Sequence, residues 1–180
     1  ASAAGGSIKC DISVPVSRIA QFIDKASADQ QYATDYHAVC GLESVINWLK
    51  GKGISVDFLR TDSGRYLPTI FRIEIPTSQD PSAQLYTLLH ECGHLLVESS
   101  TTRYRDFPNG YLRVQHDVKG RGLLYKVDVI AEEFEAWNRG LKLAERLNIV
   151  VDREKFDLVK ANALKTYFRW ASRRGRVSDE

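Results

Sequence analysis

Apolar residues recur every three or four positions in four long segments of the chain, and this spacing predicts four amphipathic helices. The segments cover residues 32–50, 81–97, 123–148 and 153–172. Gly51 and Gly53 suit the end of the first helix, and Asp80 followed by Pro81 suits the start of the second. A shorter apolar stretch, 12–24, predicts a strand or loop that passes into a further helix.

Alternating apolar and polar residues predict two strands, 54–59 and 69–75, with a turn at 61–64. In the second strand Phe71, Ile73 and Ile75 share one face, which we expect to pack on the core. Pro76 follows, and because proline has no N–H for a ladder, we expect an edge strand. An extended peptide could then pair with 69–75 by strand addition; an ordinary sheet edge is the alternative. Together these elements predict a small antiparallel sheet with additional N- and C-terminal helices.

The helix at 81–97 contains the sequence His90-Glu91-Cys92-Gly93-His94. Histidines four apart lie about one helical turn from each other, so both imidazoles project from one face and can share a metal ion. Glu91 can lie beside that metal as a general base without being a ligand. Cys92 falls on the opposite, leucine-lined side, where a core position is expected. The alternative is a chance pentapeptide whose histidines form hydrogen bonds in a core.

Three glutamates in the helix at 123–148 compete for the place of a third ligand. Glu133 lies in the middle of the apolar arc, whereas Glu132 and Glu135 fall outside it among basic residues and are expected to be exposed. A carboxylate inside an apolar stripe is costly unless it is paired or bound to a metal, so Glu133 is the predicted ligand. A carboxylate held by a core arginine is the alternative. Gly140, on the same face, would let the two ligand helices approach closely.

Two histidines and one glutamate leave the fourth tetrahedral position of a Zn²⁺ ion for water, as in catalytic rather than structural sites. The motif His90-Glu-Cys-Gly-His94, followed by a separate helix with Glu133, resembles the gluzincin class of zinc metallopeptidases. The sequence Glu133-Phe-Glu-Ala-Trp137 is similar to the E-x-E-A-N element of small ImmA/IrrE-type peptidases, with tryptophan in place of asparagine. The resemblance covers roughly residues 70–148. It implies an α+β fold with a zincin-like pair of ligand helices and peptide-bond hydrolysis, in bacterial or phage proteins.

Composition changes this interpretation little. A hydrophobic content of 43% and a charged content of 27% are typical of a globular protein. The formal charge of +2 argues neither for nor against a nucleic-acid partner. No apolar run approaches the ~20 residues that span a membrane. Cys10, Cys40 and Cys92 are far apart and odd in number, which favours a reducing cytoplasm over a disulfide framework. We expect a flexible leader at 1–7, a single zincin-like metallopeptidase domain at 8–176 and a disordered tail at 177–180.

The sequence therefore predicts a monomeric, zinc-dependent metallopeptidase that acts on a protein or peptide substrate, with His90, His94 and Glu133 on the metal and Glu91 as general base. Tyr104, Tyr111 and His116, in a loop-rich stretch, are candidate donors to the oxyanion or else surface residues. The first alternative is a non-catalytic zincin-fold regulator that binds protein or nucleic acid through that loop and the basic tail at 173–176. The second is a zinc-free helical protein. Nucleic-acid binding is not favoured, because the aromatic residues of 153–172 fall on a packing stripe.

Overall fold

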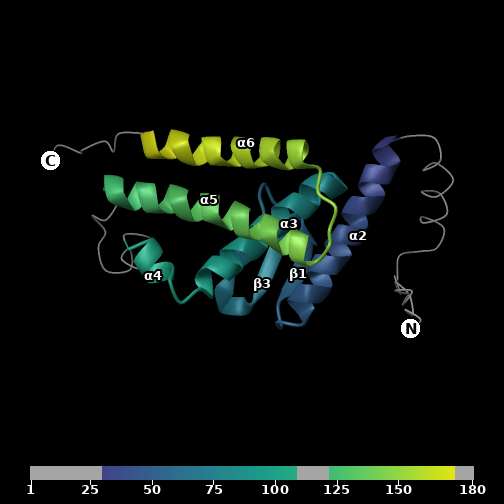
Figure 1. The fold of residues 1–180 in the computed structure, drawn as a ribbon, viewed down its shortest axis with the longest axis horizontal. Coiled ribbons are helices and arrows are strands. Elements are labelled where there is room, and N and C mark those ends of the chain that lie inside the picture. The colour runs from purple at the N-terminus through teal and green to yellow at the C-terminus, as the bar shows by residue number, and fades with distance from the viewer. Residues whose placement is uncertain (1–29, 109–121, 173–180) are drawn as a thin grey trace, which may run out of the picture. The chain divides into compact units, whose positions relative to one another are not determined.

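The computed structural model describes residues 30–108 and 122–172. The predicted leader, the stretch 12–24 and the C-terminal tail lie outside these described residues. Within them the class is α+β, as predicted, with helices and a small sheet in the order shown in Figure 1. The helices are α2 (Gln30–Lys50), α3 (Pro81–Glu98), the short α4 (Arg103–Asp106), α5 (Leu123–Arg146) and α6 (Arg153–Ser172), with a 3₁₀ turn η1 (Pro68–Ile70). The strands are β1 (Ser55–Leu59), β2 (Arg65–Leu67) and β3 (Arg72–Pro76).

The chain divides into two units, Ala1–Tyr36 and His37–Glu180. The described part of the first unit is the beginning of α2. All packing and site geometry reported below belongs to the second unit.

The sheet differs from the prediction in two ways. Its order is β1-β3-β2, with β3 parallel to β1 and antiparallel to β2, so the sheet is mixed rather than antiparallel. The strand expected at an edge is therefore central, and the prediction that a peptide adds to the 69–75 backbone is wrong because both sides of β3 are already paired. Pro76 is tolerated because it lies at the end of the ladder, opposite Leu59.

The second strand also begins later than the sequence indicates. Residues 68–70 form η1, and Phe71 follows in a left-handed conformation with φ of 51°. Phe71 is 61% exposed and does not join the core face, whereas Ile73 and Ile75 are fully buried. The alternation of the sequence therefore located the buried half of the strand and missed the turn that precedes it.

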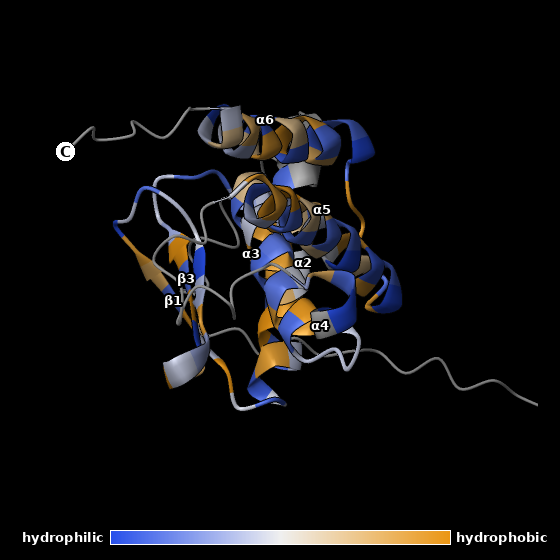
Figure 2. Ribbon diagram, turned by 90° about the vertical axis from the view of Figure 1, so that its left-hand side faces the viewer, coloured by the Kyte–Doolittle hydropathy of each residue, from blue (hydrophilic) through white to orange (hydrophobic). Residues whose placement is uncertain are grey.

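The hydrophobic core surrounds α3. Figure 2 shows α3 between the strands and α5, and α6 lies along α5. Cys92 is fully buried on the leucine side of α3, as predicted. The innermost core side chains come from α2, β3, α3 and α5 and include Val45, Leu49, Ile73, Ile75, Leu88, Leu89 and Leu143. Burial of such side chains stabilises the fold by roughly 1.5–3 kcal/mol each, and it fixes the rotation of α3 about its axis.

Candidate metal centre

The position of the two histidines follows from how α3 begins. The Asp80 side chain accepts a hydrogen bond of 2.9 Å from the backbone N–H of Ala83, and Pro81 occupies the first helical position, as predicted. With its leucines in the core, the helix turns His90 and His94 together toward α5. Their side chains are 11% and 20% exposed, so both imidazoles lie in a largely water-excluded place.

Glycines at the crossing of α3 and α5 allow the two helices to come into backbone contact. A Cβ atom at Gly93 would overlap the backbone carbonyl of Ala136, and one at Gly140 would overlap that of Leu89. Because the obstacle in both cases is backbone, no side-chain rotation could relieve it. The expected role of Gly140 in close helix approach is confirmed, and Gly93 makes the same contribution from the other helix.

This close crossing brings Glu133 to the two histidines. Nε2 of His90 lies 3.2 Å from Nε2 of His94, and Oε2 of Glu133 lies 3.3 Å and 3.4 Å from these two nitrogens. The three atoms form a nearly equilateral triangle. A tetrahedral ion with ligand bonds of about 2.1 Å has ligands about 3.4 Å apart, so the triangle has the size of one face of such a tetrahedron.

The chemistry of the three ligand atoms also fits a cation. Oε2 of Glu133 is buried and accepts no hydrogen bond from any described residue, although it lies next to two ring nitrogens. Burial by itself would raise the pKa of Glu133, but the two imidazoles outweigh it and lower the pKa to about 2. A buried carboxylate and two converging imidazole edges leave lone pairs that one metal ion would satisfy. These residues lie within reach of a single metal ion.

Glu91 lies beside this triangle and is not part of it. Burial raises the pKa of Glu91, while His90 and His94 lower it and Glu133 raises it further. The nearby backbone N–H of Tyr66 lowers the pKa of Glu91. Glu91 thus lies next to the group of His90, His94 and Glu133 without belonging to it.

The start of β2 comes close to Glu91 because residue 64 is glycine. A Cβ atom at Gly64 would collide with Cγ2 of Thr87 and would lie 3.3 Å from Oε1 of Glu91. Sequence analysis interpreted Gly64 only as part of a turn, since nothing in the local pattern says which residue the turn approaches.

The triangle opens into a cleft of about 550 Å³ whose walls come from β2, α3, α4, α5 and α6. Arg65 and Tyr66 line one side, and Tyr167 of α6 lines another. A second hollow of about 610 Å³, lined by Phe107, Phe134 and other residues of α5 and α6, contains none of the three ligands. The first cleft is therefore the one that gives access to His90, His94 and Glu133.

Glu132 was expected to be exposed, and that expectation is wrong. It is 4% exposed, and its Oε1 lies 2.9 Å from Nη2 of Arg103, while Nη1 of the same guanidinium lies 4.0 Å from Oε1 of Glu98. A helical wheel divides α5 into one apolar face and one polar face that is expected to be exposed to solvent, but α4 covers part of this polar face. A helix of four residues is too short to show a periodic pattern, so the pair of Arg103 and Glu132 could not be predicted from the sequence.

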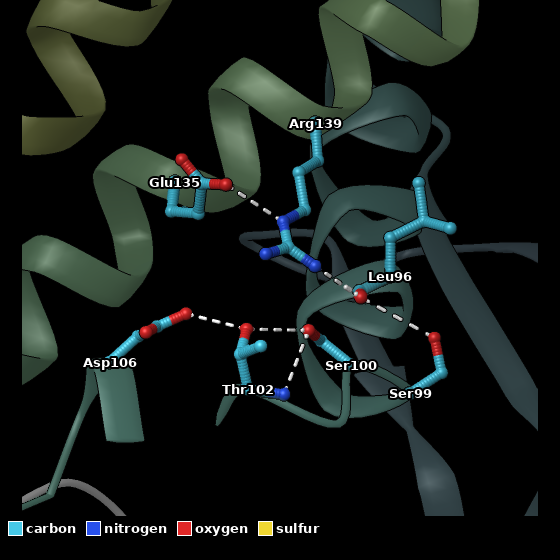
Figure 3. A network of polar contacts seen from close by, with 7 residues as sticks. All are labelled: Leu96, Ser99, Ser100, Thr102, Asp106, Glu135 and Arg139. Atoms are coloured by element: carbon cyan, nitrogen blue, oxygen red, sulfur yellow. Dashed lines mark hydrogen bonds and ion pairs between the residues drawn. The ribbon is translucent and has the colours of Figure 1, made fainter. Parts of the chain in front are cut away.

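Glu135 is half-buried and pairs with Arg139 at 2.8 Å, one turn away. Arg139 also donates a hydrogen bond of 2.6 Å to the backbone carbonyl of Leu96, and Figure 3 shows how this joins α5 to the end of α3. In the same network the Thr102 hydroxyl donates to Asp106 at 2.6 Å. Of these contacts, the hydrogen bond from Arg139 to Leu96 joins α5 to the last turns of α3, and the Thr102 bond lies within the α4 region.

Of the candidate oxyanion donors, Tyr111, His116 and the side chain of Tyr104 lie outside the described residues. Among described residues, the tyrosines that line the cleft are Tyr66 and Tyr167, and sequence analysis singled out neither for this role. Burial, followed by the charge of Glu98, raises the pKa of Tyr66, so its hydroxyl keeps its proton.

The fold and the site together define a centre of two histidines and one carboxylate on a pair of packed helices. Compared with known proteins, the chain matches no family model, no curated protein and no solved structure. Within the described residues, no helix combines the length and the apolar character needed to cross a membrane. Functional inference therefore rests on the geometry of this centre and on the motif that builds it.

Proposed function

We propose that this chain is a zinc-dependent metallopeptidase with a zincin-like pair of ligand helices, α3 and α5. The observation that supports it most is the triangle of His90, His94 and Glu133, whose sides match the face of a tetrahedral zinc site. Imidazole and carboxylate ligands suit Zn²⁺, and three protein ligands leave a fourth position open for chemistry. A structural zinc site would close that position with a fourth side chain, and no described histidine, cysteine or acidic residue joins the group.

In this proposal His90, His94 and Glu133 hold the ion, which when bound would act as a Lewis acid toward a peptide carbonyl. Glu91 accepts a proton from the attacking water on its carboxylate and later gives it to the leaving amine. Burial supports this role, because it raises the pKa of Glu91 toward the range in which a carboxylate is an effective base.

The sheet supports a peptide as substrate, along a different strand from the one the sequence suggested. In the order β1-β3-β2, β2 has one side that pairs with no other described strand. Arg65 and Tyr66 of β2 line the metal cleft. An extended peptide hydrogen-bonded along this free side would lie next to the centre and would require no particular side chains.

The experiment is proteolysis by the purified full chain, using a mixture of denatured proteins as substrate and mass spectrometry to find new chain ends. We expect cleavage that a chelator abolishes and added zinc restores. Glu91→Gln should keep the zinc and lose cleavage, since an amide cannot accept the proton. Glu154→Gln, at an exposed position of α6, is the matched control and should behave as the unsubstituted chain. Undiminished cleavage by Glu91→Gln, or by the chelated protein, contradicts the proposal.

A further inference from the structure

The side chain of His90 is oriented in an unusual way for a metal ligand. Its Nε2 faces the metal centre, whereas its Nδ1 is buried and has no hydrogen-bond partner among the described residues. In most metal sites a carboxylate or backbone carbonyl accepts a hydrogen bond from this second nitrogen and thereby fixes the ring. The described part of the chain supplies no such acceptor, so another contact must set the ring orientation.

That contact is Trp137. Its ring stacks on the His90 ring with centroids 4.3 Å apart and an interplanar angle of 19°. Trp137 follows Glu133 by one turn of α5, so a single helix face contacts His90 twice. Glu133 meets the edge of the imidazole, and Trp137 covers its face. A rotation of the imidazole about its Cβ–Cγ bond would break both contacts.

Trp137 is itself held firmly. It is 3% exposed, and its ring meets that of Phe156 edge-on at 5.3 Å, while Phe156 meets Tyr86 edge-on at 5.4 Å. These residues belong to α5, α6 and α3, so three helices clamp the ring that lies on His90. His94 has no comparable stacked ring among the described residues and is the more exposed of the two histidines.

We infer that Trp137 is the positioning residue for His90: by stacking, it holds the imidazole in the orientation that places Nε2 at the metal. This inference rests on the metal centre of the proposed function. Stacking contributes to metal affinity because it selects the binding rotamer in the metal-free chain, so less rotational freedom is lost when the ion binds. The side chain acts through His90 and touches neither metal nor substrate.

Zinc affinity of three variants, measured by competition with a chelating dye, tests the inference without any substrate. Trp137→Leu removes the stacked ring, and Trp137→Phe keeps one. Phe156→Leu is the matched control, because it removes a buried ring of the same cluster that does not touch His90. We expect about tenfold weaker zinc binding for Trp137→Leu and a change of less than about threefold for Trp137→Phe. Effects of this size are usual for aromatic stacking and for residues that contact metal ligands.

Phe156→Leu should lower the melting temperature, but because leucine still packs against Trp137, zinc affinity should change by less than about threefold. Unchanged affinity in Trp137→Leu overturns the inference and leaves the metal site standing. Equal losses in Trp137→Leu and Phe156→Leu also overturn it, since they would indicate a general packing effect. Failure of the unsubstituted chain to bind zinc overturns the proposed function together with this inference.

Fluorescence gives a second, independent measurement. The chain has three tryptophans, so Trp48→Phe combined with Trp170→Phe leaves Trp137 as the only one. Because its ring lies 4.3 Å from a ligand ring, its emission should change as zinc is added, with saturation at one ion per chain. The same titration of a variant that also carries His90→Ala should give no change. An emission that does not respond to zinc in the first of these proteins contradicts the stacked geometry.

Discussion

Gly93 of α3 lies directly against the backbone carbonyl of Ala136 in α5, with no room for a methyl group between them. This contact brings together residues that are far apart in the sequence, the two histidines of α3 and Glu133 of α5. His94 follows Gly93 by one residue, and Glu133 precedes Ala136 by three. The separation of the two helices at this point therefore sets the size of the ligand triangle.

Gly93→Ala should separate the helices and weaken both the fold and the centre. Overpacking of this kind costs about 1–3 kcal/mol, and we expect a loss of that size in the free energy of unfolding of the metal-free protein, measured by urea. Zinc affinity should fall by more than about tenfold, since a shift of ligand helices disturbs all three ligands. Gly51→Ala, at a helix end where a Cβ meets only ordinary contacts, is the control and should change neither quantity.

The two neighbouring glutamates of α5 should behave differently when each is changed to glutamine. Glu133→Gln removes a ligand, and we expect at least about 100-fold weaker zinc binding, beyond the range of outer-contact effects. Glu132→Gln should keep zinc affinity within about threefold and lower stability by about 1–3 kcal/mol, because Arg103 loses a charged partner in a mostly buried place. Zinc loss in Glu132→Gln with retention in Glu133→Gln would reverse the assignment of the ligand.

Glu133 could be singled out from the sequence because a carboxylate within an apolar arc needs a partner. The arc itself is visible in the helical pattern of α5 alone. Sequence reasoning failed for Glu132, whose burial depends on α4, a helix too short to leave a periodic pattern. It failed again for the sheet, because β2 has only three residues, too few to show an alternating pattern. The edge position of 69–75 was predicted from Pro76, but a proline at the end of the ladder is compatible with a central strand.

Zinc affinity should depend on pH through the histidines. Burial by itself lowers the pKa of His94, but Glu133 and the other nearby carboxylates raise it above the usual 6.5 in the metal-free chain. A raised pKa means that the proton is held to a higher pH and competes with the metal there. Zinc affinity should therefore be full at about pH 8. As the pH is lowered from there, the affinity should already begin to fall before pH 6.5 is reached.

Glu133 contributes nothing to that fall, because its pKa of about 2 keeps it ionised throughout. The measurement is a series of zinc competition titrations between about pH 8 and about pH 5.5. An affinity that stays constant across this range would contradict imidazole ligation.

Gly64→Ala should affect hydrolysis more than metal binding. The added methyl group would press on Thr87 and on the Glu91 carboxylate, so we expect turnover to fall by about tenfold or more while zinc affinity stays within about threefold. Thr87→Ser removes the Cγ2 atom and should restore part of the activity when combined with Gly64→Ala. If Gly64→Ala leaves turnover intact, the approach of β2 does not position Glu91.

The central claim, a metal centre formed by His90, His94 and Glu133, is tested most directly by X-ray absorption at the zinc edge of the purified, zinc-loaded chain. We expect one zinc per chain with a first shell of nitrogen and oxygen only, at about 2.0–2.1 Å, and the multiple-scattering pattern of two imidazoles. In Glu133→Gln the zinc content should fall to background under the same loading. A sulfur neighbour at about 2.3 Å would assign the zinc to a cysteine site instead and contradict the account.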